Sequence, residues 1–270
     1  MKRYLMPILL VPIVFFAFGV TIAAGTSGAQ STAKKSAKKA TKKKAGGGKV
    51  AIKCPAAVTA SDGSIADCPN TGCGPSLDPN LNKQKNIAPG NGTPVDRDMS
   101  FLAELPDPVP GFNIGDTREK LTALGEGKII RVVAYALVAR KGSRESCNCG
   151  LTKAADTDNH IVLVDPETVE PTLKESEPDS QTAEFTPRVR LTHAGLKGAD
   201  LEKLITATSD KALLVRVTGV QMFDSEHSLG PFQLKRHNNW EIHPVLKLEY
   251  CPEDKTCVED SDANWVDMEK

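Results

Sequence analysis

The alternation of apolar and polar residues predicts a β-rich domain in the second half of the chain. Residues 128–140 are apolar on both faces and rich in β-branched side chains, as is typical of a buried central strand. Apolar residues recur at helical spacing in 198–206, which predicts one short amphipathic helix. Five strands are predicted around this helix, at residues 128–140, 160–164, 183–191, 213–222 and 239–250. Gly219 marks a candidate bulge or tight bend in the fourth of them.

The order of these elements resembles the OB-fold, a five-stranded barrel with a helix between its third and fourth strands. The resemblance covers residues 128–250 and implies a mainly β fold, with a binding face over the second and third strands and the adjoining loops. The run Trp-Glu-Ile-His-Pro at 240–244 is also similar to a segment of exported bacterial proteins, from which no activity is carried over. An open β-sandwich is the alternative fold.

The predicted barrel domain covers residues 116–250, and four further segments precede or follow it in the sequence. Residues 1–29 combine a basic start, an apolar run and small residues, which predicts a cleaved signal peptide; a retained membrane anchor is the alternative. Residues 30–50 are Lys-rich and of low complexity, so we expect a disordered tether. Residues 51–115 should form an irregular Cys/Pro/Gly-rich arm that wraps the domain. Residues 251–270 are expected to be a disulfide-closed loop and an acidic tail.

The chain has seven cysteines, and export to the periplasm or the cell exterior would let disulfides persist. Because seven is odd, at least one thiol is free, pairs with another chain or binds something else. Cys68 and Cys73 are expected to staple the arm, either to each other or to the body of the protein.

Two closely spaced cysteine pairs lie outside the arm. Cys251 and Cys257 are close enough in sequence to favour a local bridge. A bridge between Cys147 and Cys149 would close a very small, strained loop and suggests a redox role. The alternative is that these two cysteines bridge to different partners.

A formal net charge of zero conceals two oppositely charged parts. The first 53 residues contain eleven Lys and Arg and no Asp or Glu, so the remainder holds 23 basic against 34 acidic residues. Binders of single-stranded nucleic acid combine a positive groove with aromatic stacking platforms, and this body offers neither, since aromatic residues are 5% of the chain. Nucleic acid is therefore an unfavoured partner. The Lys-rich tail is expected to contact an anionic envelope surface, with a plain spacer as the alternative.

Five residues of the predicted strands and their entry points carry groups that could do chemistry. Asp158 and His160 lie at the start of the second strand, Glu184 is on the third, and Glu241 and His243 are on the fifth. Imidazoles and carboxylates are ligands for zinc and related divalent metals, so these are candidate metal or ligand residues. The ordinary alternative for each histidine is a structural hydrogen bond. No spacing matches a metal signature such as H-E-x-x-H.

Three more residues are candidate ligand contacts. Trp240 is either a stacking platform or, as we favour, a plug of the core. Strand alternation in 183–191 would turn Arg188 and Arg190 outward, on the implied binding face. No nucleophile elbow, P-loop or Rossmann glycine pattern occurs in the chain.

The sequence favours an exported, non-enzymatic binding or envelope-associated module with an unspecified ligand or protein on the barrel face. It calls for no cofactor and no retained transmembrane helix. The alternative is a secreted, metal-assisted hydrolase in which His160, His243 and a nearby carboxylate bind a divalent metal and activate water.

Overall fold

A computed structural model describes residues 50–269 except 77, 89, 91, 194–197, 208–211 and 230–234. The predicted signal peptide and the Lys-rich segment up to residue 49 lie outside the described residues. Among the residues that are described, no helix has the length and apolar character needed to cross a membrane.

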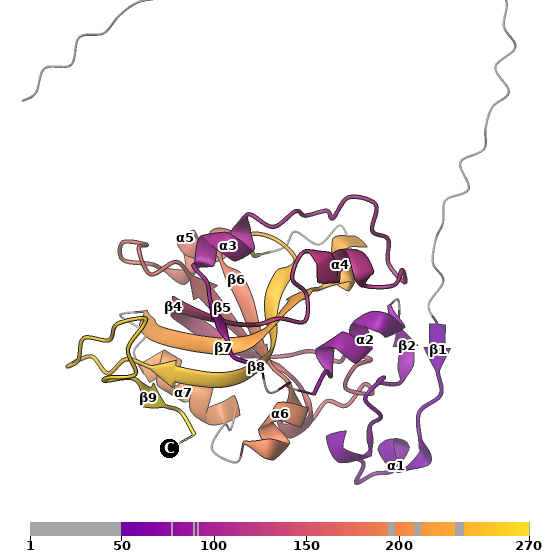
Figure 1. The fold of residues 1–270 in the computed structure, drawn as a ribbon. Coiled ribbons are helices and arrows are strands. Elements are labelled where there is room, and N and C mark those ends of the chain that lie inside the picture. Colours follow the sequence, from indigo (N-terminus) through magenta and orange to yellow (C-terminus); the bar gives the residue numbers. More distant parts are fainter. Residues whose placement is uncertain are drawn as a thin grey trace, which may run out of the picture. The chain divides into compact units, whose positions relative to one another are not determined.

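The main domain is a closed five-stranded β-barrel (Figure 1). Its strands are β4 (Ile129–Lys141), β5 (Asn159–Val164), β6 (Gln181–Phe185), β7 (Leu213–Phe223) and β8 (Trp240–Tyr250). They pair in the order β4-β5-β6-β8-β7, and β7 pairs again with β4. The β6–β8 pair is parallel and the other barrel pairs are antiparallel. The mainly β, OB-like fold is therefore confirmed, and because the β4–β7 pairing closes the sheet, the open sandwich is wrong.

The barrel core is built by alternate residues of each strand. On β4, Ile130, Val132 and Ala134 are buried, while the residues between them are partly exposed. Gly219 lies where the pairing of β7 with β8 shifts register, as expected for a bulge. A Cβ at this position would lie 2.4 Å from Ile242 Cγ2, so only glycine lets the two strands approach here.

The predicted third strand is too long. It ends at Phe185, because Thr186 caps a helix: its side chain accepts a hydrogen bond from the backbone N–H of Val189. Proline at the first helical position favours this start, so α6 covers Pro187–Thr192. The predicted helix at 198–206 is present as α7 (Gly198–Ala207). Two short helices therefore connect the third and fourth barrel strands where one was predicted.

Short elements make up the arm and the loops between the barrel strands. The arm contains two short antiparallel strands and a small buried cluster around Val58 and Ile65. The remaining elements are β1 (Val50–Ile52), α1 (Ala56–Thr59), η1 (Ile65–Asp67), β2 (Gly74–Ser76), α2 (Pro79–Lys85), β3 (Val95–Asp96), α3 (Met99–Ala103), α4 (Glu119–Ala123), η2 (Ala154–Asp156), α5 (Leu173–Ser176), η3 (Glu177–Asp179), η4 (Ser225–Leu229) and β9 (Val266–Asp267).

Three disulfides join six of the seven cysteines: Cys54–Cys73, Cys68–Cys149 and Cys251–Cys257. The expected bridge from the arm to the body is Cys68–Cys149, and the local bridge between Cys251 and Cys257 is confirmed. A Cys68–Cys73 bridge is wrong, since each of these residues has another partner.

Cys147 and Cys149 do not bridge to each other, and the alternative that one of them reaches the arm holds for Cys149. Cys147 is a free, buried thiol, and Cys149 pairs with Cys68 across the arm. The redox role suggested for a strained Cys-x-Cys bridge therefore loses its basis.

Candidate functional site

The strand register brings the predicted chemical residues to one face of the sheet. Ala183 on β6 pairs with Ile161 on β5 and with Ile242 on β8, and all three are core residues. Successive side chains of a strand point to opposite faces. Their neighbours His160, Glu184, Glu241 and His243 therefore lie together on the outer face of the barrel wall.

Buried contacts of opposite charge connect these side chains. His243 Nδ1 lies 2.9 Å from Glu184 Oε2 and 3.2 Å from Glu241 Oε1. Glu241 in turn pairs with Arg236, whose Nη1 is 2.5 Å from Oε2. On the other side, Glu184 Oε1 lies 3.4 Å from His160 Nε2. Glu184 thus stands between the two histidines that the sequence singled out.

The series of contacts continues into the arm. Glu145 Oε1 lies 3.8 Å from His160 Nε2, and its Oε2 is 2.9 Å from Lys85 Nζ on α2. Lys85 is 3.1 Å from Asp224 Oδ2, which is 2.9 Å from His227 Nδ1. Positive and negative groups therefore alternate from His227 to Arg236, a series that we call the charge network.

Charge balance within the network shifts the pKa values of its members. Burial alone would lower the pKa of His243, but the charges and hydrogen bonds of Glu184 and Glu241 together outweigh it and raise the value to about 10. Burial would likewise lower the pKa of His160, but Glu184 and Glu145 together raise it to about 9. Both imidazoles therefore carry a proton at neutral pH and neutralise the buried carboxylates.

Lys85 in the arm and Glu145 in the loop after β4 show the same compensation. Burial by itself lowers the pKa of Lys85, yet Asp224 and Glu145 hold it well above its usual value. Burial would raise the pKa of Glu145, but Lys85 and His160 lower it to about 2. These groups stay ionised because each is buried beside its counter-charge.

Asp158 lies beside this series. One oxygen accepts a hydrogen bond from Asn148 Nδ2 at 3.1 Å, and Oδ1 is buried with no hydrogen bond in the described part of the chain. Burial and the charge of Glu145 raise its pKa to about 7. Ligand atoms of Asp158, Glu184 and His243 all lie within 4.8 Å of one another.

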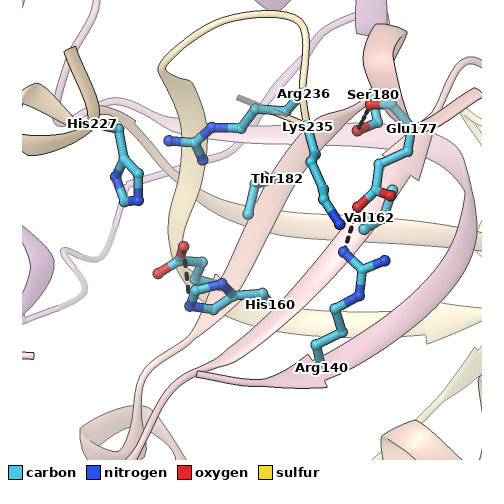
Figure 2. A pocket seen from close by; sticks show the side chains of 10 residues that line it. Arg140, His160, Val162, Glu177, Ser180, Thr182, His227, Lys235 and Arg236 are labelled. Carbon is cyan, nitrogen blue, oxygen red and sulfur yellow. Dashed lines mark hydrogen bonds and ion pairs between the residues drawn. The ribbon is translucent and has the colours of Figure 1, made fainter. Parts of the chain in front are cut away.

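A cavity of about 230 Å³ opens over β5 and β6, the strands where the OB-fold resemblance places a binding face. Figure 2 shows His227, Arg236 and His160 on one side of this pocket, and Arg140, Lys235 and Glu177 on the other. The lining residues are Arg140, His160, Val162, Glu177, Ser180, Thr182, Glu184, His227, Lys235 and Arg236. Five of them are basic or imidazole side chains and two are carboxylates.

Trp240, Arg188 and Arg190 lie elsewhere. Trp240 is fully buried in the core, so it is the plug that we favoured and has no surface for a ligand. Arg188 donates to the backbone oxygens of Cys68 and Pro69, and Arg190 donates to Thr157 O and to Oδ1 of Asn159, the first residue of β5. Both arginines lie in α6 and not in the predicted strand, and they connect loops outside the pocket lining.

Sequence reasoning missed five of the nine members of the charge network. Lys85, Glu145, Asp224, His227 and Arg236 lie in the arm and in loops, where charged residues are usually solvated. The only available signal was a run of charged residues flanking the predicted strands. Their partners are more than 30 positions away in several cases, so pairing could not be inferred from spacing.

Known proteins offer no match to this chain. No protein-family model matches it, and neither a curated protein nor a solved structure does. No family is assigned, and the roles of these residues must be argued from their own geometry.

Proposed function

We propose that the protein is an exported, non-enzymatic binding module that takes a small anion in the pocket over β5 and β6. The observation that carries this proposal is the excess of cationic groups in the lining. Of the two carboxylates, Glu177 is paired with Arg140 and Glu184 stands between two imidazoles. His227 and Arg236 pair with Asp224 and Glu241 outside the lining, so the positive charge that the pocket offers an entering anion is chiefly that of Lys235, which has no ion pair among the described residues.

Arg236 supplies the most specific support. Its Nη1 pairs with Glu241, while its Nη2 is buried and has no hydrogen bond within the described residues. A buried guanidinium N–H without an acceptor is costly, and a carboxylate or phosphate oxygen is the acceptor that it prefers. Ligand pockets for drug-sized molecules are roughly 300–1,000 Å³, so a cavity of about 230 Å³ suits an anion of few atoms.

Isothermal titration of the chain with inorganic phosphate and with succinate tests the proposal. We expect Lys235→Gln to weaken binding about tenfold, since a charge-assisted hydrogen bond contributes roughly 1.5–3 kcal/mol. Lys141→Gln is the matched control, because Lys141 is an exposed lysine of β4 that does not line the pocket. No binding of either anion at millimolar concentration, or equal loss in both variants, would refute the pocket as an anion site.

Export and association with an anionic envelope surface are part of this proposal. Three disulfides are compatible with an oxidising compartment, and the Lys-rich segment 30–50 would supply the electrostatic contact. Deleting residues 30–49 should release the protein from the envelope fraction and leave its unfolding transition unchanged. Unchanged association after the deletion would remove the tether from the proposal.

A metal-assisted hydrolase is the second candidate. The observation that favours it is the position of Glu184, which lies 3.4 Å from His160 and 2.9 Å from His243. Such an enzyme would need a divalent metal beside the pocket to polarise water. Turnover of phosphate and carboxylate esters that is lost in His160→Gln would support the hydrolase over the binding module.

A further inference from the structure

We propose that Glu145, His160 and Glu184 bind a divalent metal ion beside the pocket. This inference goes beyond anion binding and does not depend on it. One ligand atom of each residue lies within 4.8 Å of the other two. An imidazole and two carboxylates form a donor set that suits Zn²⁺ and Mn²⁺.

One donor separation matches ligands of one ion, and a second exceeds that range by a few tenths of an ångström. His160 Nε2 lies 3.4 Å from Glu184 Oε1 and 3.8 Å from Glu145 Oε1. Ligands bound at about 2.0–2.2 Å and at tetrahedral angles are roughly 3.3–3.6 Å apart. Charge-assisted hydrogen bonds are shorter, about 2.7–2.9 Å, so the imidazole is too far from either oxygen for a good one.

His160 Nε2 is one of several buried polar atoms around the site that have no hydrogen bond among the described residues. It is buried and makes no hydrogen bond in the described part of the chain, although two carboxylates face it. Leaving such a group unsatisfied is unfavourable, and a metal ion between the three side chains would satisfy it.

Both carboxylates are held by their other oxygen. Lys85 Nζ lies 2.9 Å from Glu145 Oε2, and His243 Nδ1 lies 2.9 Å from Glu184 Oε2. Each Oε1 is thereby left facing His160. Outer contacts of this kind orient metal ligands in known sites, and they assign positioning roles to Lys85 and His243.

Two further features lie beside the proposed ligands: a glycine and a buried carboxyl group. A Cβ at Gly142 would lie 3.2 Å from His160 Nε2, so glycine leaves room beside the nitrogen. The buried Asp158, whose Oδ1 has no hydrogen bond among the described residues, lies within 4.8 Å of the ligand Glu184. His160 and Glu184 also line the pocket, which would connect a bound ion with an entering ligand.

The test is metal binding by the full chain, purified without a chelator or a His tag. Elemental analysis and titration with Zn²⁺ and Mn²⁺ should find one equivalent of one of these ions. We expect His160→Gln and Glu145→Gln to weaken its binding at least 100-fold. Glu177→Gln is the matched control, because Glu177 is a carboxylate of the same pocket that is paired with Arg140.

Several results would overturn the metal site. One is the absence of Zn²⁺ and Mn²⁺ binding by the unaltered chain at millimolar metal, and another is unchanged affinity in both ligand variants. If a variant fails to fold, the absorption spectrum of the Co²⁺-loaded unaltered chain decides, since coordination by one imidazole and carboxylates differs from thiolate or aqueous coordination. Phosphate binding by the chelator-treated chain, and its loss in Lys235→Gln, measures the proposed function separately.

Discussion

Glu184 Oε2 lies 2.9 Å from His243 Nδ1, and both side chains are almost completely buried. The contact joins β6 to β8, the one parallel pair of barrel strands, which share only two register partners. A short parallel pairing is a weak point of a barrel. This ion pair therefore links the stability of the barrel to the geometry of the candidate site.

Replacing Glu184 with glutamine should destabilise the fold by about 3–5 kcal/mol, because it leaves the protonated His243 buried without its strongest counter-charge. Urea unfolding at pH 7 with a chelator present measures this loss without any contribution from metal. The double variant Glu184→Gln/His243→Gln should recover part of it, since no imidazolium is then stranded. A single variant within about 0.5 kcal/mol of the unaltered chain would show that the pair is not a stabilising contact.

The two disulfides Cys68–Cys149 and Cys251–Cys257 should differ in their contributions to stability. The first closes 81 residues and the second only 6. Loop-closure entropy in the unfolded chain predicts about 4.5 kcal/mol for the long loop and about 2 kcal/mol for the short one. Denaturant unfolding of the two double Cys→Ala variants compares them directly. Equal losses of stability in the two variants would show that the Cys68–Cys149 bridge does not restrict the unfolded chain more than the short bridge does.

The pair of His227 and Asp224 should make stability depend on pH. The pKa of His227 is raised, chiefly by its bond to Asp224, against burial and the charges of Arg236 and Lys85. Burial would raise the pKa of Asp224, but Lys85 and His227 hold it well below its usual value. The contribution of His227 to the free energy of unfolding is complete below its unfolded pKa of about 6.5, and it is lost as the pH rises through the folded pKa. The contribution of Asp224 is lost in acid, below about pH 4.

We therefore expect His227→Gln to cost most stability between about pH 4 and 6.5, and less as the pH is raised to 9. Urea unfolding of both proteins at pH 5.5 and at pH 9 measures the difference. His237→Gln serves as the control, since His237 is an exposed histidine with no ion pair in the described part of the chain. A cost of His227→Gln that does not change with pH would exclude the ion pair as its cause.

The barrel was accessible from the sequence because its signals are local. Residues 128–140 are apolar on both faces of the predicted strand, and Gly219 interrupts a run of β-branched residues. Both signals act through steric and solvent effects within a few positions of the chain, so they predict a strand and a bulge. The end of the third strand was missed at Thr186 and Pro187. There a helix cap and a proline outweighed an alternation that continued to Leu191.

The candidate site was only partly accessible. By itself the sequence determined five of its members, Asp158, His160, Glu184, Glu241 and His243, because chemically capable side chains stand out in or beside apolar strands. Their roles in binding or catalysis stay predictions. Only the tertiary structure showed which cations pair with the carboxylates of the site and which cysteines form the long-range disulfide, because these residues lie in the arm and the loops. A buried charge is set by which distant counter-charge the fold brings within a few ångströms, and no local pattern encodes that distance.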